Sequence, residues 1–484
     1  MPFTRRQFLT LSSVAGAAAL LAGCRSPAEL LAGLPPPAAW PSGRDPAWHA
    51  LSRLTFGPRA DERAHVAEIG LAAWIDEQLA PEQLDDRPAD LRVRRFDILT
   101  MDSSLIFDVR EANARRQLQQ ATLLRAVYSR RQLYELMVDF WSDHFSISTA
   151  KGDGAWLKPI DDRAVIRPHA LGSFRDLLWA SLHSPAMLQY LDNHANYRDA
   201  PNENYARELM ELHTLGVQAG YTQGDVRELA RCLTGWTVDQ QLFRGQFRFD
   251  PAQHDDGAKQ VLGLHIPAGG GQHDVEQVFE QLLAHPALPQ QIARKLVRRF
   301  VADDPPPQLV AAVATTFTHT RGEIKAVLRT LLHAPEFATA PPKFKRPLHY
   351  LAGALRQLNA NTNGGPPLLE ALARMGQPLF MWPTPDGFPD ATAAWSGGLL
   401  TRWQLALALA TNALPGTSID LDALMRAAGT REATGLLDRL GTLLLGAPLA
   451  PAVRGQVAGA LAHTGDDRAA YVAALLAAPA YQWR

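Results

Sequence analysis

Imidazole and carboxylate side chains with helical spacing gather between residues 140 and 256 of the 484-residue chain. At about 100° per residue, His144 falls within the apolar arc of its predicted helix, so its ring is expected to point into the core. The same projection places Glu208 between the directions of Leu212 and Leu215 and predicts that Glu208 is buried. A buried ionised carboxylate is costly unless it is paired, hydrogen-bonded or bound to a metal ion. Glu208 therefore needs a specific partner.

Two interpretations of this polar group are open. The candidate partners of Glu208 are His144, Asp143 and Arg207, together with Asp192 and His194 upstream. One interpretation is a metal or acid–base site, because Glu208 and Glu211 on one helix plus a histidine from another match the way helical bundles hold divalent metals. The Glu-x-x-His pairs of di-iron bundles are missing, however, and Arg207 can bridge locally to Glu211 four residues on. The second interpretation, a polar network that locks helices together, is favoured.

A loop rich in Gly, Asp and His over residues 250–274 supplies further candidates. Charged groups in a loop need no burial and can serve a ligand. His254 and Asp255 are expected either to join a metal site or to form an Asx-type turn before Gly257.

A metal-dependent enzyme would draw its catalytic and metal-binding residues from these segments. The catalytic candidates are His144, Glu208 and Arg207; the candidate ligands of a divalent metal are His144, Glu208, Glu211 and His254, with Asp192 and His194 as secondary candidates. Ligands of one metal ion must all lie within about 2.0–2.5 Å of a single point. Convergence of these side chains would therefore test the metal hypothesis.

Composition excludes several classes of protein. The standard catalytic signatures of serine hydrolases, zincins, haem attachment, P-loops and dinucleotide binding are absent. The formal charge of −1 falls by two, to −3, when a signal containing Arg5 and Arg6 is removed. Proteins that bind nucleic acid usually carry a positive net charge or a basic patch, so DNA or RNA binding is not expected. Cys24 and Cys232 are the two cysteines, and Cys232, on a helical pattern, is predicted to be a buried structural thiol.

Helices are the elements predicted to position these residues. Apolar residues recur at i, i+3 and i+4, as over residues 226–233, and no convincing run of alternating strands is found. Asp45-Pro46 begins the body as a helix N-cap followed by proline at the first helical position. Long loops at 250–274 and 376–396 interrupt the helices, and loops of this length are often functional. The predicted fold class is all-α, an irregular multi-helical body with a C-terminal helical subdomain.

The first 24 residues predict an export signal. Arg5 and Arg6 are the arginine pair of a twin-arginine signal, and the Ala/Leu-rich stretch at 11–22 is too short to span a bilayer permanently. Leu21-Ala22-Gly23-Cys24 is typical of a lipoprotein cleavage box, so Cys24 is expected to carry the lipid anchor. The protein is expected to cross the membrane folded and to stay anchored in the cell envelope on the periplasmic side. Arg25 after the cysteine favours the outer membrane where the host has one.

The chain is accordingly divided into four parts. These are the twin-arginine lipoprotein signal at 1–24, a Pro-rich tether at 25–45, a main helical domain at 46–415 and the C-terminal helical subdomain at 416–484. The proline-rich composition of the tether predicts a semi-rigid spacer between the lipid and the folded body.

Several long and unusual segments carry a family resemblance. They are Leu54–Pro58, Phe140–Phe145, Ala170–Phe174, Pro201–Gly216, Tyr221–Gln223, Leu233–Trp236 and His254–Asp255 with Lys259. Over about residues 46–410 they resemble the bacterial family catalogued as domain of unknown function 1800. The resemblance implies an exported, mainly helical protein without a settled activity, often encoded beside an exported protein similar to sulfatases and alkaline phosphatases, a candidate partner. That family usually has Asn where this chain has Asp143, so a role that depends on the charge of Asp143 is not expected.

Three functional hypotheses follow. The first, which we favour, is an envelope lipoprotein that acts as a binding or assembly component and contains a buried polar site. The second is a metal-dependent, hydrolase-like envelope enzyme in which Arg207 orients an anionic substrate. The third, a purely structural surface protein, predicts no cleft near residues 250–274.

Overall fold

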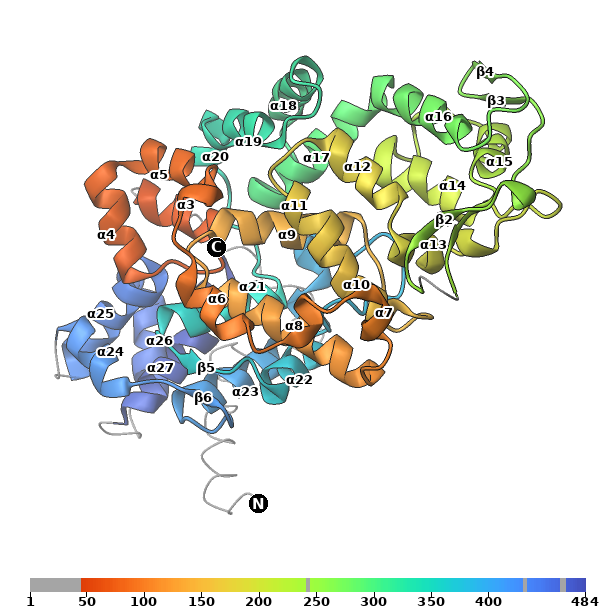
Figure 1. Cartoon of the computed structure of the whole chain (residues 1–484). Coiled ribbons are helices and arrows are strands. Elements are labelled where there is room, and N and C mark those ends of the chain that lie inside the picture. The colour runs from red at the N-terminus through yellow and green to blue at the C-terminus, as the bar shows by residue number, and fades with distance from the viewer. Residues whose placement is uncertain (1–44, 241–243, 430–432, 462–466) are drawn as a thin grey trace. The chain divides into compact units, whose positions relative to one another are not determined.

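The computed structural model describes residues 45–240, 244–429, 433–461 and 467–484 (Figure 1). The predicted export signal with Arg5 and Arg6, the predicted lipidation site Cys24 and the tether up to residue 44 lie outside these residues. The described chain is mainly helical, which confirms the predicted all-α class. No helix within it is long and apolar enough to cross a membrane.

The chain divides into two compact units, each assembled from segments that are far apart in the sequence. Unit 1 contains the residues up to Trp74, Pro341–Gln377 and Asp390–Arg484, and unit 2 contains Ile75–Ala340 and Pro378–Pro389. Residues 416–484, predicted as a C-terminal subdomain, belong to unit 1 together with parts of the predicted main domain.

Unit 1 is built mainly from short helices. Its elements are α3 (Pro46–Leu54), α4 (Ala60–Ile69), α21 (Pro347–Gln357), β5 (Asn361–Thr362), α22 (Pro366–Arg374), η7 (Thr392–Ala394), η8 (Ser396–Gly398), α23 (Leu399–Ala410), β6 (Thr417–Ser418), α24 (Leu421–Ala428), α25 (Ala433–Leu445), α26 (Pro451–Leu461), α27 (Arg468–Ala477) and η9 (Pro479–Gln482). Helix α5 (Leu71–Gln78) contains the boundary at which the chain passes into unit 2.

Helix α21 forms the centre of unit 1. All of its residues are buried, and the hydroxyl of Tyr350 donates to the carbonyl groups of Arg402 in α23 and Leu476 in α27, at 3.0 and 3.1 Å. Helix α3 begins as predicted: Asp45 accepts a hydrogen bond from the amide of Ala47, and Pro46 occupies the first helical position, where its missing N–H costs nothing.

Unit 2 contains the candidate site. Its elements are η1 (Pro81–Gln83), α6 (Arg87–Val93), η2 (Asp97–Leu99), α7 (Ser103–Ile106), α8 (Glu111–Tyr128), α9 (Gln132–His144), α10 (Gly154–Asp161), the π-helix η3 (Asp162–Ile166), α11 (Arg167–His169), α12 (Phe174–Leu182), α13 (Pro185–Tyr190), η4 (Asn193–Ala195), α14 (Asn204–Glu208), the π-helix η5 (Leu209–Thr214), α15 (Gln223–Cys232), β1 (Trp236–Val238), β2 (Phe247–Phe249), η6 (Pro251–Gln253), β3 (Lys259–Val261), β4 (Leu264–Ile266), α16 (His273–Ala284), α17 (Ala287–Phe300), α18 (Pro307–His319), α19 (Ile324–Leu332) and α20 (Pro335–Ala338).

Short antiparallel strand pairs occur where the sequence predicted none. Strand β1 pairs with β2, with Trp236 opposite Phe249, and β3 pairs with β4, with Lys259 opposite Ile266. Both lie in the part of the chain that follows α15, coloured green in Figure 1. Strands of three residues are too short to give a periodic signal, which is why they were missed. The predicted 250–274 loop therefore contains a 3₁₀ turn and a hairpin.

Helix α9 carries the candidate His144, and Arg231 of helix α15 contacts the candidate Asp255. The buried face of α9 includes Trp141, whose indole N–H donates to the carbonyl of Ala170 at 3.0 Å. Helix α15 begins with a capping box, in which Thr222 and Asp225 bond reciprocally to each other's backbone amides. Cys232 near the end of α15 is buried as predicted, and burial raises the pKa of its thiol to about 12.

Candidate functional site

His144 ends helix α9 and points into the core, as predicted, with 4% of its surface exposed. Its Nδ1 lies 3.0 Å from Nζ of Lys295, and its Nε2 lies 3.1 Å from the carbonyl oxygen of His213. Because an ammonium group can only donate, Nδ1 accepts and Nε2–H donates to the carbonyl. Burial, followed by the positive charge of Lys295, holds the pKa of His144 well below its usual value. His144 is therefore a neutral ring with both nitrogens engaged.

Lys295 of α17 is the partner that the sequence did not reveal. Its Nζ donates to the Leu212 carbonyl at 3.0 Å as well as to His144, so it links α9 to the π-helix η5. Burial lowers the pKa of Lys295 to about 8, although the negative charge of Asp386 opposes the shift. Few local cues distinguish this lysine from the other cations of an amphipathic basic helix.

Glu208 is half-buried, so the prediction of a fully buried carboxylate was wrong. The helix changes from α to π after Glu208, and the projection at about 100° per residue fails beyond that point. Along α14 and η5 the buried side chains instead recur in pairs every four residues, at Tyr205 and Ala206, Leu209 and Met210, and His213 and Thr214. The ring of His213 thereby takes the core position, and Glu208 lies at the edge of the buried face.

Glu208 lies near two other carboxylates. Partial burial, and after it the repulsion from Glu211, raises the pKa of Glu208; Arg207 opposes this shift and Asp386 adds to it. The predicted bridge between Arg207 and Glu211 is not what the structure shows, because Nη2 of Arg207 contacts Glu203 at 3.1 Å and Gln223 at 3.0 Å. Because the helix changes to π geometry after Glu208, Arg207 pairs with Glu203, four residues before it, and not with Glu211, four residues after it.

Asp192 contacts two polar side chains. It adopts a left-handed conformation at φ 62°. Its Oδ2 accepts from Nζ of Lys151 at 2.9 Å and from the side-chain amide Nδ2 of Asn204 at 3.2 Å. Asp192 thus joins the end of α13 to the start of α14. His194 follows in η4, half-buried, and its Nδ1 is enclosed without a hydrogen-bond partner among the described residues.

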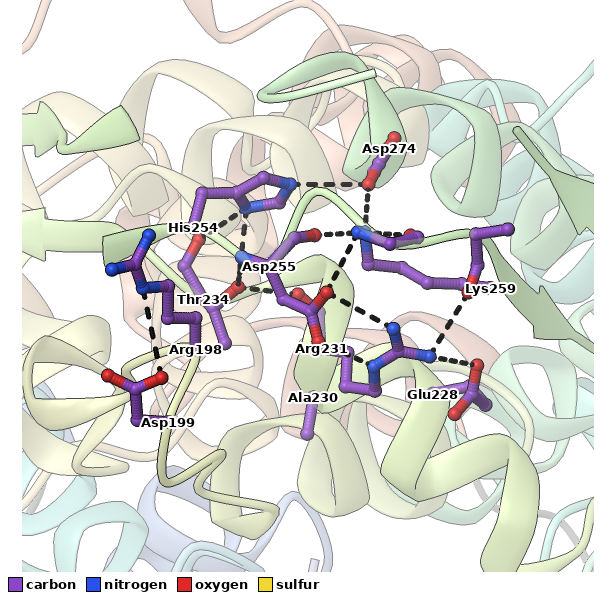
Figure 2. A network of polar contacts seen from close by, with 12 residues as sticks. Arg198, Asp199, Glu228, Ala230, Arg231, Thr234, His254, Asp255, Lys259 and Asp274 are labelled. Carbon is purple, nitrogen blue, oxygen red and sulfur yellow. Dashed lines mark hydrogen bonds and ion pairs between the residues drawn. The ribbon is translucent and has the colours of Figure 1, made fainter. Parts of the chain in front are cut away.

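His254 is buried, with 2% of its surface exposed, which corrects the expectation that it lies in a solvated loop. Figure 2 shows its contacts: Nδ1 lies 2.8 Å from the carbonyl oxygen of Thr234, and Nε2 lies 3.2 Å from Oδ2 of Asp274. The same Asp274 oxygen accepts from Nζ of Lys259 at 2.6 Å. We call His254, Lys259 and Asp274 the buried network. The first turn of α16 and strand β3 enclose this network, so His254 and Lys259 are buried although the surrounding sequence is polar.

Asp255 connects the buried network to helix α15. Its Oδ1 accepts from the amide of Gly257 at 2.9 Å, which confirms the predicted Asx-type turn. Its carboxylate also accepts hydrogen bonds from Nε and Nη2 of Arg231, at 2.7 and 3.1 Å (Figure 2). These hydrogen bonds lower the pKa of Asp255. Arg231 in turn contacts Glu228 at 2.8 Å. The 254–259 segment is therefore held on both sides by charged groups.

An open polar groove of about 660 Å³ lies in unit 2 beside β1 and β2. Its lining residues are Gln189, His194, Asn196, Tyr197, Gly235, Thr237, Val238, Asp239, Gln240, Arg248, Asp250 and Gln253. At Gly235, φ is 77° and an added Cβ would lie 2.5 Å from the carbonyl oxygen of Asp250 and 3.3 Å from Cβ of His254. The buried network therefore lies directly behind the groove and fixes the segments that form its wall.

The candidate metal ligands do not converge. Within the described ranges, no three His, Cys, Asp or Glu side chains are close enough together to hold a metal ion. His144 bonds to Lys295 and His213, whereas His254 bonds to Thr234 and Asp274. The predicted set of His144, Glu208, Glu211 and His254 is thus not assembled around one point.

Four residues important to this region were absent from the sequence-based candidates: Lys259, Asp274, Lys295 and Asp386. Partial signals existed, because Lys259 belongs to a segment that carried the family resemblance and Asp386 lies in the long 376–396 loop. Asp274 and Lys295 lie on regular helices, where a charged residue normally indicates a solvated face. Their burial depends on contacts with distant segments.

A family model described as "Protein of unknown function (DUF1800)" matches residues 49–483, nearly the whole described chain. No curated protein matches the chain. No solved structure matches it either.

Proposed function

Because the chain belongs to the DUF1800 family, whose description names no activity, we propose its function from its own geometry: it is a binding component of the cell envelope that holds a polar ligand in the groove of unit 2. The groove carries this proposal. Its volume falls in the range of small-ligand sites, about 300–1,000 Å³, and its wall is held in place by the buried network.

Preorganisation supports binding at this position. Gly235 donates its amide to the Asn196 carbonyl at 3.1 Å, and its own carbonyl accepts from the amide of Asp250 at 2.8 Å. His254 closes the same segment from behind by contacting the carbonyl of Thr234. A groove whose wall is bonded at successive residues loses little conformational entropy when a ligand enters.

The other hypotheses receive less support. A metal-dependent enzyme needs ligands that meet at one point, and the described candidates are engaged separately. A purely structural surface protein predicts no cleft near residues 250–274, yet Asp250 and Gln253 line the groove.

The sequence supports a location for this binding component. Arg5, Arg6 and Cys24 carry the pattern of a twin-arginine lipoprotein signal, so we propose that the protein is exported folded and anchored on the periplasmic side of the envelope. A co-encoded exported protein similar to sulfatases or phosphatases is the partner that we propose on the basis of the family resemblance.

The groove is tested by calorimetry on the detergent-solubilised, exported protein. The probes are maltotriose, cellotriose, chitotriose, mannotriose, spermidine, inorganic phosphate and a neutral tetrapeptide. We expect saturable binding of at least one probe, with an affinity that Arg248→Ala changes about tenfold. A neutral or anionic probe should bind more weakly to the variant, whereas spermidine, which the guanidinium repels, should bind more tightly. Arg329→Ala is the matched control, because Arg248 and Arg329 have side-chain exposures of 54% and 52% and each pairs with one aspartate.

Two results would overturn the proposal. One is the absence of saturable binding by any probe. The other is binding that Arg248→Ala leaves unchanged, since the ligand would then lie outside the groove.

A further inference from the structure

We infer that the ligand of the groove is a carbohydrate, bound as a short, uncharged glycan segment. This inference rests on the proposed binding function and adds the chemical class of the ligand. It is carried by the composition and pairing of the lining side chains, which exclude anionic and apolar ligands, and by an exposed aromatic ring at the groove.

The groove is not built for an anion. Its formally charged lining residues are Asp239, Arg248 and Asp250, so acidic groups outnumber basic ones. The charge of the one guanidinium among the described lining residues is offset, because Nη2 of Arg248 contacts Oδ2 of Asp250 at 3.2 Å. Recognition of a phosphate, sulfate or carboxylate uses a guanidinium that is free to form two parallel hydrogen bonds. A negatively charged ligand would meet net negative charge here.

The groove is also not built for a lipid or an apolar cofactor. Of the twelve lining residues within the described chain, ten have polar side chains, the exceptions being Gly235 and Val238. Sites for apolar ligands are lined mainly by hydrophobic and aromatic side chains. An apolar ligand placed here would bury the amides and the hydroxyl of the lining without hydrogen bonds, which is unfavourable.

Neutral amides and a hydroxyl contribute much of the polar lining. Gln240 and Gln253 each carry a carbonyl acceptor and two N–H donors, whereas the side-chain amide of Gln189 bonds to Asp153, donating to its Oδ2 at 3.1 Å and accepting from its backbone N–H at 3.3 Å. The hydroxyl of Thr237 donates its hydrogen to the His194 carbonyl at 3.1 Å, so its oxygen can accept a hydrogen bond from a ligand but cannot donate one. A sugar hydroxyl is both a donor and an acceptor. A side-chain amide can therefore bind a sugar hydroxyl whether that hydroxyl donates or accepts the hydrogen bond.

Tyr197 adds an exposed ring at the groove. It is 43% exposed although it is a large aromatic residue, and its segment is held by a backbone bridge between Tyr197 and Ala200. A sugar ring presents C–H groups on one face, and these carry partial positive charge. The face of an aromatic ring is negative, so the two surfaces attract when they stack. Tyr197 thus supplies an apolar surface against which one face of a sugar ring can stack.

The calorimetric series identifies the class of the ligand. We expect at least one of the four neutral trisaccharides to bind saturably, with the affinity weakened about tenfold by Tyr197→Ala and retained by Tyr197→Phe, which keeps the ring. Val217→Ala is the control, because Val217 is 71% exposed and is not a lining residue. Unchanged near-ultraviolet circular dichroism of Tyr197→Ala would show that the fold is intact.

The outcomes separate this inference from the function on which it rests. If only spermidine, phosphate or the tetrapeptide binds in a manner that depends on Arg248, the carbohydrate inference is overturned and the binding function stands. The same holds if a trisaccharide binds but Tyr197→Ala has no effect, because stacking would then be absent. If no probe binds, both proposals fall.

Discussion

The carboxylate of Asp274 accepts a hydrogen bond from the ammonium group of Lys259 over 2.6 Å, and neither side chain is exposed to solvent. This pair, which lies behind the groove, joins strand β3 to the first turn of α16. Two opposite charges removed from water depend on each other, because each has lost its hydration. The relationship has a direct consequence for stability.

Asp274→Ala is expected to lower the free energy of unfolding by about 3–5 kcal/mol, because it leaves the ammonium of Lys259 buried without a counter-charge. Urea unfolding measures the loss. Glu82→Ala is the control: it removes the partner of Lys325 in a pair whose side chains are 61% and 37% exposed, and should cost less than about 1 kcal/mol. Equal losses for the two variants would contradict the argument, whereas the double variant Lys259→Met/Asp274→Leu should recover part of the stability.

His213→Phe is expected to stabilise the protein increasingly as the pH is lowered. Burial lowers the pKa of His213 to about 3, from a usual value of 6.5, and neither ring nitrogen has a hydrogen-bond partner in the described chain. Between these two pKa values the unfolded chain binds a proton that the folded chain does not, so the stability contributed by the neutral ring is lost as the pH falls. Phenylalanine removes this proton linkage.

Urea unfolding of the parent and of His213→Phe at pH values of about 7, 6 and 5 measures the effect, which approaches about 1.4 kcal/mol per pH unit below the usual pKa. His144 is present in both proteins, so its contribution to the pH dependence of the unfolding free energy cancels to a first approximation. A stability difference that is independent of pH would show that His213 is not buried as a neutral ring.

Gly387→Ala is expected to destabilise unit 2 by about 3 kcal/mol or more, because steric overlap is added to backbone strain. At φ 73°, an added Cβ would lie 2.1 Å from the carbonyl oxygen of Asp143, where the 378–389 segment crosses the end of α9. Gly269→Ala is the control: its φ is 84° with no atom within 4 Å of the added Cβ, so only the backbone cost of about 1–2 kcal/mol applies. Thermal unfolding distinguishes the two, and similar losses would refute the close approach.

The proposed location predicts two different failures of targeting. Replacing both Arg5 and Arg6 by Lys should retain the unprocessed chain in the cytoplasm, because the twin-arginine pair is lost. Cys24→Ser should leave export intact but release the protein from the membrane fraction, because no acyl chain can be attached. Cell fractionation with labelled fatty acid follows both changes. A Cys24→Ser protein that stays bound to the membrane would rule out the lipid anchor.

Local sequence signals predicted the helix beginnings and part of the core. Asp45-Pro46 starts α3, and His144 points into the core. These features depend on residues within a few positions of each other, which a helical projection describes well. The projection failed at Glu208, because a π-helix shifts the buried face and no residue type signals that change in advance.

By itself, the sequence determined the all-α class, the N-cap of α3 and the family resemblance, because each is encoded in a short segment or in overall composition. It also predicts an export signal, which stays a prediction. Only the tertiary structure decided which polar groups meet. Lys295 reaches His144, and Asp274 reaches both His254 and Lys259, across separations in the chain that no local pattern specifies. A charged side chain is buried only when other segments pack over it, and here those segments are distant in the sequence.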